Sequence, residues 1–596
     1  MPAGAGIGVY NMKISEASKN RVIFLTLLIF SFFSMFYYGS LKEGYHVDEV
    51  YSYGLANSEY LPFMHFGAHD YNVKDWMMEY GAGESFGDLF KNLWNDFQIL
   101  KECDFQWRDS VIYRDYLTAQ VNSADTRTTT WLPGQAYIDY LAVSKSNTFN
   151  YASVYYNQRG DVHPPLYYMI LHTLCSFFPG VFSPWFALSM NILFLLLMLA
   201  VLYRMTKAHL GGETTALVTV AVTGLCCGTM TTAVFLRMYA LMTLMVVTCC
   251  AVHLRAIADD FQWKGKKGVL LVLTVIGGYM THYYFVLYAI GIAAVSVIVM
   301  AVRKKWHSLL RYILLLTCAA AIGLCIWPFS VKHVFFGYRG NAAMGILSTG
   351  EFYLIRTRLI LQQISAQVLG GQGYVLWIAA AVVAGVCLWK RGRNLPVIKG
   401  AVVFLPILFY VIMVSQIVPF FADRYVMCVF PFVCLFMTAG IAFCLKKLMG
   451  SLDGRWFNRG MAAAGVAILL LNNAYFHTPG YLSRGGQETV AVPEDTDCIY
   501  VLPDGDWNES AVDSTILAQC RNVAVAYRSS LPGLAEGYQY LPGSTVMVAI
   551  QKGMDIEEVL LEVKALFHIE ELMEIERQQG DVAVRILLSQ GEISME

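Results

Sequence analysis

Apolar stretches of about 20 residues recur along most of this chain, and they constrain its fold more than any other feature. An α-helix of that length spans the hydrocarbon core of a lipid bilayer. Hydrophobic residues make up 56% of the sequence and charged residues only 15%, which lies far outside the composition of soluble globular proteins. We therefore expect a polytopic α-helical membrane protein with eleven transmembrane helices, near residues 22–39, 183–203, 214–234, 237–254, 268–282, 284–302, 309–328, 373–389, 397–418, 425–445 and 460–476.

Lysine and arginine residues cluster on alternate connections between these stretches. Because basic residues favour the cytoplasmic side, the N-terminus is predicted inside, and the loops 40–182 and 329–372 and the tail from 477 are predicted outside. The shorter apolar stretch 166–181 is interpreted as an interfacial or re-entrant helix, because counting it as a span would reverse this bias. The clusters are Lys13/Lys19/Arg21, Arg204/Lys207, Arg255/Lys264/Lys266/Lys267, Arg303/Lys304/Lys305, Lys390/Arg391/Arg393/Lys399 and Lys446/Lys447/Arg455/Arg459.

The chain divides into two predicted domains. Residues 1–476 form the transmembrane domain, and its first outer loop, 40–182, includes amphipathic pieces around 85–100 and 131–144. Residues 480–596 change to the pattern of a soluble fold and predict a small extracytoplasmic α/β domain. The expected elements of this domain are strands at 497–503, 522–528 and 544–550, a helix at 556–567, and a hairpin turn at 578–581 between two final strands.

The cysteine pattern does not predict a disulfide framework. Eleven of the 14 cysteines lie in apolar runs, where a thiol serves as packing material. Cys498 and Cys520 flank a helical stretch of the tail and would pair in an oxidising compartment, although free thiols are the favoured interpretation.

An acidic pair, Asp48-Glu49, follows the first apolar stretch on the predicted outer side. A pair in that position can simply cap or solvate the end of a helix. A carboxyl group beside hydrocarbon can also hold a raised pKa and accept a proton from an attacking hydroxyl group. The second interpretation makes Asp48 and Glu49 candidate catalytic residues.

A second motif, Asp161-Val162-His163-Pro164-Pro165, lies near the end of the same outer loop. An acidic residue followed by proline is a helix-start signal. The rigid Pro-Pro pair would also hold Asp161 and His163 in a fixed position at the membrane face. Both interpretations are compatible, and Asp161 and His163 are candidate catalytic residues.

Cationic and hydrogen-bonding side chains gather at other connections on the same predicted face. Arginine has a planar fork of donors that suits phosphate oxygens, so a lipid phosphate is the expected ligand. The alternative for any one arginine is that it extends from a helix to the interface, and this alternative has even odds for Arg356 and Arg358. The candidate phosphate-binding residues are Arg237, Tyr239, His282, Tyr283, Arg424 and Tyr425, with Arg339, Arg356 and Arg358 as further basic groups.

Motifs for other chemistries are absent from the sequence. It contains no P-loop, no glycine-rich dinucleotide motif after a strand and no Cys/His spacing that suits zinc. A formal net charge of −1 provides no basic surplus for nucleic acid, so no nucleic-acid partner is expected. The energy for a reaction must then come with the substrate. No cofactor is certain, a divalent cation stays open, and no metal ligands are assigned.

Taken together and in this order, the motifs resemble those of the GT-C glycosyltransferases, which use polyprenyl-phosphate sugars and include the protein O-mannosyltransferases and the lipid A aminoarabinose transferases. The resemblance covers residues 10–476 and rests on the motifs at Asp48-Glu49, Asp161 to Leu166, Arg237 to Tyr239, Thr281 to Tyr283 and Asp423 to Tyr425. It implies that Asp48 is the base for the acceptor hydroxyl, that Glu49 supports it, and that transfer inverts the sugar. The long first loop and the α/β tail depart from the better-known members.

These features lead to one favoured function and two rivals. We expect a membrane glycosyltransferase of the cell envelope that takes a sugar from a polyprenyl-phosphate donor to an envelope glycan, lipid or protein. A transporter or flippase for lipid-linked sugars is the first rival, because polar groups at helix ends also serve gating. A non-catalytic envelope scaffold is the second. The sugar and the acceptor are not specified by the sequence.

Overall fold

The computed structural model describes the two predicted domains in segments. The described residues are 16–62, 131–336, 340, 343, 345, 346, 353–373, 375, 378, 395–449, 454–475, 478–482, 492–504, 510–536, 546–551, 553–569, 573–579 and 582–589. The predicted amphipathic piece at 85–100, nearly all of the predicted span at 373–389, Arg339 and the centre of the hairpin turn at 578–581 lie outside them.

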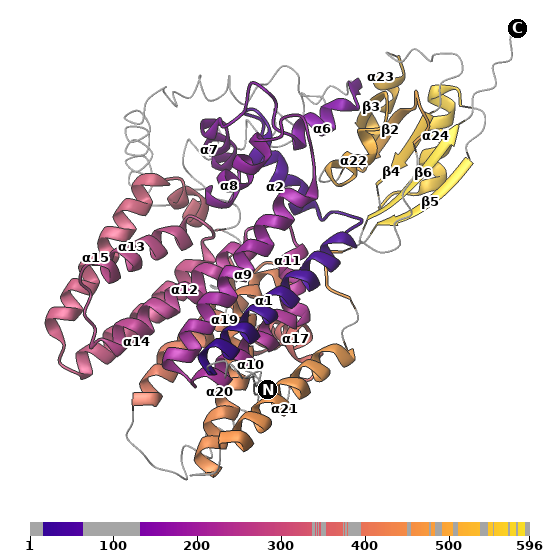
Figure 1. The fold of residues 1–596 in the computed structure, drawn as a ribbon. Coiled ribbons are helices and arrows are strands. Elements are labelled where there is room, and N and C mark those ends of the chain that lie inside the picture. The colour runs from indigo at the N-terminus through magenta and orange to yellow at the C-terminus, as the bar shows by residue number, and fades with distance from the viewer. Residues whose placement is uncertain are drawn as a thin grey trace, which may run out of the picture.

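Long apolar helices make up the larger part of the fold (Figure 1). Among the described residues, seven helices are long and apolar enough to cross a membrane, and one bent pair would make an eighth. The chain is therefore a multi-pass membrane protein. The helices of this bundle are α1 (Glu16–Ser40), α9 (Pro184–His209), α10 (Glu213–Leu225), α11 (Cys227–Val234), α12 (Tyr239–Ala258), α13 (Lys266–Tyr279), α14 (Tyr284–Val302), α15 (Trp306–Ile326), α17 (Tyr353–Leu369), α19 (Leu395–Ile417), α20 (Phe430–Met449) and α21 (Gly454–Tyr475).

The predicted total of eleven spans is matched only in part. The spans predicted near 22–39, 183–203, 237–254, 284–302, 309–328, 397–418 and 425–445 each correspond to one of the seven apolar helices. The stretch at 268–282 forms α13, which has 14 residues, and the stretch at 460–476 forms α21, whose first turns carry Arg455 and Arg459. Neither is among the seven, so the structure does not confirm the count of eleven.

A break between α10 and α11 bends the predicted span at 214–234 by 53°. The backbone N–H of Cys227, at the start of α11, donates to Oδ1 of Asn472 at 2.9 Å. At the other end of α11, Nδ2 of Asn191 donates to the carbonyls of Ala233 and Phe235 at 3.2 and 2.8 Å. These buried amides satisfy backbone groups that a broken helix leaves without partners. As a result the chain after α11 turns sharply into α12.

Four short helices from the segment between α1 and α9 cover one end of the bundle. They are α2 (Val47–Asn57), α6 (Gln135–Leu141), α7 (Tyr151–Gly160) and α8 (Leu166–Ser176). Gly54 marks the crossing of α2 and α6, since a Cβ atom there would lie 2.0 Å from the ring of Tyr140. Helix α8 has 11 residues, too few to cross a bilayer, as expected for the stretch at 166–181.

The tail forms the predicted α/β unit. Its sheet has the order β1-β3-β2-β4-β6-β5, in which β2, β3 and β4 are parallel and β5 and β6 form a hairpin. The predicted strands and helix are confirmed as β2 (Asp497–Leu502), β3 (Asn522–Tyr527), β4 (Val546–Ile550) and α24 (Ile556–Phe567), and the hairpin as β5 (Met573–Gln579) and β6 (Val582–Ser589).

One edge of this sheet comes from the segment between α1 and α9, which the sequence did not predict. Strand β1 (Trp131–Pro133) pairs antiparallel with β3, and Trp131 lies opposite Ala524. Directly after β1, Gly134 approaches the carbonyl oxygen of Cys520 so closely that a Cβ atom would lie 2.0 Å from it. Only glycine fits this contact. The loop and the tail are therefore parts of one folded unit, in which the thiols of Cys498 and Cys520 are free.

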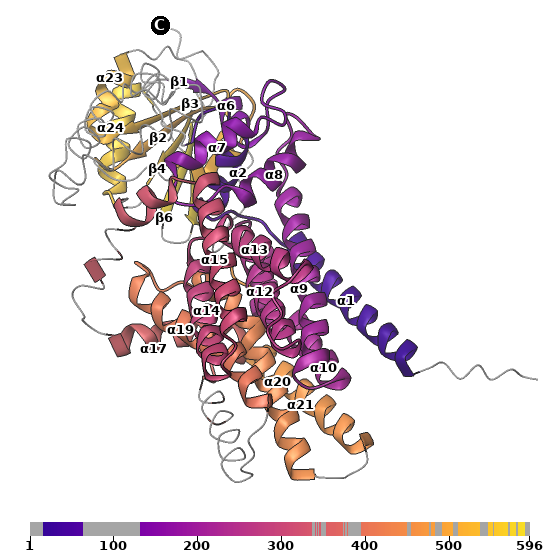
Figure 2. The same cartoon turned by 90° about the vertical axis from the view of Figure 1, so that its left-hand side faces the viewer.

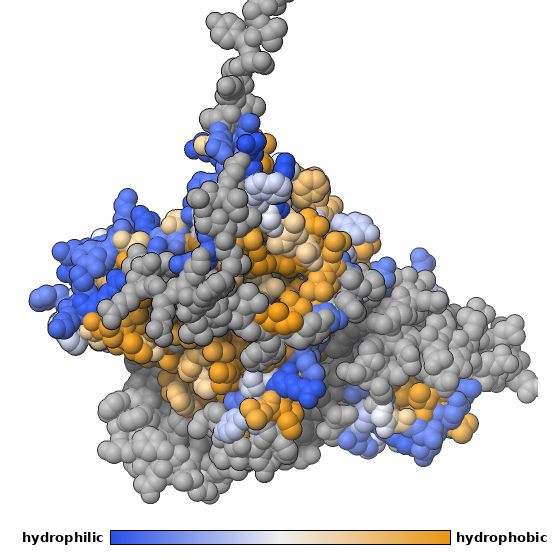
Figure 3. Space-filling view, turned by 90° about the horizontal axis from the view of Figure 1, so that it is seen from below, coloured by the Kyte–Doolittle hydropathy of each residue, from blue (hydrophilic) through white to orange (hydrophobic). Residues whose placement is uncertain are grey.

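The sheet and the four loop helices lie at the same end of the bundle, and the C-terminal end of α20 and the start of α21 lie at the opposite end (Figures 1 and 2). Seen from that opposite end, apolar residues gather over much of the drawn face, and hydrophilic residues form separate clusters nearer its margins (Figure 3). Side chains such as Leu193, Leu273 and Leu310 are more than half exposed, as expected for surfaces that face lipid.

Candidate active site

Helix α2 begins with a capping box that places Asp48 and Glu49 in different surroundings. Nδ1 of His46 accepts the N–H of Asp48 at 3.0 Å, and the carboxylate of Glu49 accepts the N–H of His46 at 2.7 Å. Both acids lie in the first turn, where the helix dipole favours negative charge. Glu49 therefore caps a helix, but it caps the start of α2 and not the end of the first apolar helix as the capping interpretation had it, while the side chain of Asp48 points elsewhere.

Glu49 is fully buried and joins three segments of the chain. Nζ of Lys42, also buried, lies 3.0 Å from its carboxylate, and the N–H of Leu236 donates to it at 2.8 Å. Nζ of Lys42 also donates to the carbonyl of Tyr481 at 2.6 Å. Burial raises the pKa of Glu49, and Lys42 and the two N–H donors act in the opposite direction. Glu49 therefore joins the start of α2 to Lys42 and Leu236, and its carboxylate does not face a substrate.

Asp48 lies against two arginines that come from distant parts of the sequence. Its Oδ2 is 2.5 Å from Nη1 of Arg424, which is in η3 (Asp423–Val429). Nη1 of Arg237 donates to the backbone carbonyl of Asp48 at 3.0 Å and to the hydroxyls of Ser52 and Tyr168 at 3.1 and 3.2 Å. Within the described part of the chain, Oδ1 of Asp48 accepts no hydrogen bond.

The raised pKa expected for a carboxyl group at the membrane face is wrong for Asp48. Burial does act to raise the pKa of this group, but the guanidinium groups of Arg237 and Arg424 outweigh burial and hold it below its ordinary value. Asp48 is consequently ionised at neutral pH, with one carboxylate oxygen on Arg424 and 27% of the side chain exposed.

Asp161 and His163 form a hydrogen-bonded pair beside Asp48. Nδ1 of His163 lies 2.7 Å from Oδ2 of Asp161, and the ring of His163 lies 5.6 Å from that of His282. Asp161 ends α7, and α8 begins directly after Pro165, so the motif does mark a helix start as well as a site. Burial lowers the pKa of His163, and Asp161 acts in the opposite direction. Their charges act on Asp48 and Arg237.

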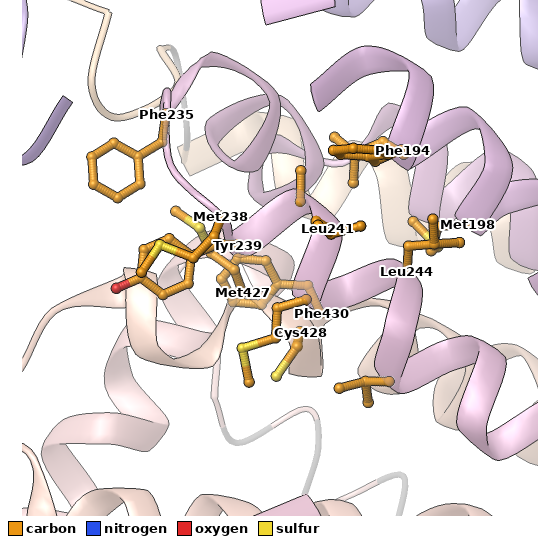
Figure 4. Packing of buried hydrophobic residues seen from close by; sticks show 14 of the residues in the cluster. Phe194, Met198, Phe235, Met238, Tyr239, Leu241, Leu244, Met427, Cys428 and Phe430 are labelled. Carbon is orange, nitrogen blue, oxygen red and sulfur yellow. The ribbon is translucent and has the colours of Figure 1, made fainter. Parts of the chain in front are cut away.

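The turn between α11 and α12 supplies Arg237 and Tyr239, and packing against η3 holds this turn in place. Met238 and Tyr239 lie beside Met427 and Phe430 in the buried core (Figure 4). The ring of Tyr239 lies 5.5 Å from that of His282. Nε of Arg237 and Nε2 of His282 are buried and have no hydrogen-bond partner among the described residues. Buried polar atoms without partners are uncommon and mark places where a ligand can bind.

Two of the predicted phosphate-binding residues, Tyr283 and Tyr425, make structural contacts. The hydroxyl of Tyr283 lies 2.8 Å from Nδ1 of His333 and accepts the indole N–H of Trp327 at 2.8 Å, which directs it away from Asp48. Tyr425 lies under the guanidinium of Arg424, 5.3 Å from ring centroid to Cζ, and so supports that side chain. Arg356 donates to two backbone carbonyls of α19 and the chain after it, in keeping with a structural role.

Sequence reasoning missed three residues that complete the site: Lys42, His46 and Tyr481. Lys42 had one available signal, because it is a lysine just outside a span on the side predicted to be poor in basic residues. His46 precedes Asp48 by two residues, a position from which its side chain can cap the start of a helix. Tyr481 carries no signal, since an aromatic residue after a membrane helix is usual.

A metal ligand set is not evident in this site. Among the described residues, no group of three or more His, Cys, Asp or Glu side chains could hold a metal ion.

Fold and site together define a multi-pass helical membrane protein with an arginine-carboxylate-histidine site at the end that carries the sheet. No protein-family model and no curated protein matches the chain. Among solved structures, the fold is similar to that of ArnT from Cupriavidus metallidurans. The structure of ArnT bound to undecaprenyl phosphate shares 12% identity, with a TM-score of 0.40, 71% of this chain covered and 87% of ArnT. The structure without ligand shares 11%, with a TM-score of 0.42 and coverage of 76% and 93%.

Proposed function

We propose that this protein is a GT-C type glycosyltransferase that transfers a sugar from a polyprenyl-phosphate donor to an acceptor hydroxyl group at the outer face of the membrane. The observation that carries the proposal is the ionised carboxylate of Asp48, which lies 2.5 Å from Arg424 and against Arg237 and leaves Oδ1 without a partner in the described part of the chain. This arrangement places a proton acceptor beside cationic groups that suit a phosphate.

The reaction is a single displacement. The oxygen of the acceptor hydroxyl attacks C1 of the sugar from the face opposite the phosphate, and the bond from C1 to the phosphate oxygen breaks. The hydroxyl proton passes to Asp48, and the electron pair of the broken bond stays on the polyprenyl phosphate. Because one bond to C1 replaces another on the opposite face, the configuration inverts. Polyprenyl phosphate leaves readily, so a single carboxylate base and cationic stabilisation of the departing phosphate suffice.

The remaining residues of the site have supporting roles in this proposal. Arg237, Arg424 and the unpartnered Nε2 of His282 face the phosphate, and Tyr239 and Tyr425 support His282 and Arg424. Asp161 holds His163 through Nδ1, which orients the imidazole next to the reacting groups. Glu49 is a positioning residue that fixes the start of α2. A transporter would need the same donor contacts, but it would not need a carboxylate base.

Donor binding provides the first test of the proposal. Replacing Arg237 or Arg424 with alanine is expected to weaken binding of undecaprenyl phosphate at least tenfold, because a charge-assisted contact to phosphate contributes about 1.5–3 kcal/mol. Undecaprenyl phosphate is the appropriate probe, since ArnT binds it. Native mass spectrometry of the purified protein measures the affinity.

Arg303→Ala is the matched control for this test. Arg303 lies at the C-terminal end of α14, in a basic cluster that the charge pattern assigns to the cytoplasmic side. Its replacement is expected to leave the affinity unchanged. Equal losses in all three variants would show that the assigned phosphate site is wrong.

The proposed topology has eleven spans, with residues 1–21 inside and residues 477–596 outside. A cysteine placed at Ser530, in the tail domain, is therefore expected to react with a membrane-impermeant thiol reagent in intact cells. A cysteine at Lys264, in a predicted cytoplasmic turn, is expected to react only after permeabilisation. The reverse pattern would place the site on the cytoplasmic face. Labelling of both positions in intact cells would indicate a leaky preparation, and the wild-type protein is the control for that.

A further inference from the structure

Residues 478–482, named here the linker segment, connect the last helix of the bundle to the sheet of the tail domain. Helix α21 ends at Tyr475 and β2 begins at Asp497. Three hydrogen bonds hold the backbone of this segment. Nζ of Lys42 donates to the carbonyl of Tyr481 at 2.6 Å, the N–H of Glu43 donates to the carbonyl of Leu482 at 3.0 Å, and the N–H of Gly480 donates to Oγ1 of Thr231 at 3.2 Å.

Tyr481 adopts a backbone conformation that is unfavourable for its residue type. Its φ is +65°, in the left-handed region that bulky side chains rarely occupy. Such a conformation persists only where the surrounding contacts determine it, and it is found preferentially at functional sites. The contacts of Tyr481 therefore determine its backbone conformation.

The side chain of Tyr481 contacts each of the three segments that surround Asp48. Its hydroxyl donates to Oδ1 of Asp423, the residue before Arg424, at 2.7 Å. Its ring stacks on Phe235, two residues before Arg237, with centroids 4.0 Å apart and planes 20° apart. It also meets the ring of His46, the capping residue of α2, at 5.7 Å.

Asp423 transmits this contact to the site. Its Oδ2 accepts Nε2 of Gln367 at 2.8 Å, so Gln367 and Tyr481 fix both carboxylate oxygens. With Asp423 fixed, the first turn of η3 has one orientation, and in that orientation Nη1 of Arg424 reaches Asp48. Removing the hydroxyl of Tyr481 would free one side of Asp423 without removing any group from the site itself.

From these contacts we infer that Tyr481 is a positioning residue, which holds η3 so that Arg424 is directed at Asp48 and at the donor phosphate. The inference rests on the proposed function, because it assigns Arg424 to the phosphate.

The test uses full-length purified protein with undecaprenyl phosphate as the probe. Tyr481→Phe keeps the stacked ring and removes only the hydroxyl, so affinity is expected to fall about three- to tenfold while the thermal unfolding temperature stays near that of the wild type. Tyr279→Phe is the matched control, because it also removes a hydrogen-bonded tyrosine hydroxyl, one at the end of α13 that bonds the carbonyl of Trp327 and the hydroxyl of Ser330 instead of a carboxylate beside Arg424. Its affinity is expected to equal that of the wild type.

A double-variant cycle separates positioning from a general structural role. In the Arg424→Ala background, adding Tyr481→Phe is expected to cause no further loss of affinity, because the tyrosine acts through that arginine. Wild-type affinity in Tyr481→Phe, or an equal loss in both backgrounds, would overturn the inference. If the wild-type protein itself fails to bind the lipid, the proposed function fails, and a structure of the Tyr481→Phe variant decides: Arg424 still placed on Asp48 would overturn the inference as well.

Discussion

Replacing Asp48 with asparagine is expected to slow sugar transfer by about 10²–10⁴-fold, the usual loss when a positioned base is removed. Asparagine preserves the size of the side chain and one oxygen acceptor for Arg424, which lies 2.5 Å from the carboxylate. Folding and donor binding are therefore expected to change little. The measurement is the turnover of a polyprenyl-phosphate sugar by purified protein, alongside its affinity for undecaprenyl phosphate.

Asp139→Asn provides the control for this variant. Asp139 is an exposed carboxylate on α6, at the same end of the bundle, and it contacts only Gln135 in the described part of the chain. Its replacement is expected to leave turnover unchanged. Turnover near the wild-type rate in Asp48→Asn would refute the assignment of the base. Donor binding without any turnover, in wild type and variant alike, would instead favour the transporter.

A second large effect is expected from Lys42→Met. Lys42 and Glu49 are both buried, with side-chain exposures of 1% and 0%, and their charged groups lie 3.0 Å apart. Removing one partner leaves a buried charge without compensation, which costs about 3–5 kcal/mol of stability. Because Lys42 also bonds the carbonyl of Tyr481, the linker segment loses a contact at the same time. Thermal unfolding in detergent should show a large decrease in the unfolding temperature.

Two variants make this prediction specific. Lys207→Met removes one partner of an ion pair with Glu213 whose side chains are 49% and 25% exposed, and it is expected to cost about 0–1 kcal/mol. Lys42→Met combined with Glu49→Gln removes the uncompensated charge and is expected to recover part of the lost stability. If Lys42→Met and Lys207→Met unfolded at the same temperature, Lys42 and Glu49 would not form the buried ion pair described here.

Much of the fold was predictable because it depends on neighbours in the sequence. Hydropathy over about 20 residues identifies membrane-crossing helices, and the seven apolar helices lie where the sequence placed them. Alternation and turn residues identify strands, and β2, β3 and β4 begin and end within about two residues of the prediction. The helix start at α8 was also readable, since a proline signal acts within one turn.

The candidate site was predictable as a set of residue types on one face, but its internal roles were not. Asp48, Arg237, Arg424, His163 and His282 do come together. Asp48 and Glu49, adjacent in sequence, nevertheless separate into a partly buried carboxylate that contacts Arg424 and a fully buried structural one. This division depends on Lys42 and Leu236, whose positions relative to α2 are set by the packing of α1 and the turn before α12.

Taken by itself, then, the sequence determined the membrane class, the elements of the tail and the side chains available for chemistry, because each of these follows from local composition and spacing. Tertiary structure alone decided that β1 completes the sheet, that two arginines lower the pKa of Asp48, and that Tyr481 lies among the site residues. These features join groups as far apart in the chain as Lys42 and Tyr481, 439 residues. No local pattern carries such a contact, since it exists only once the helices have packed.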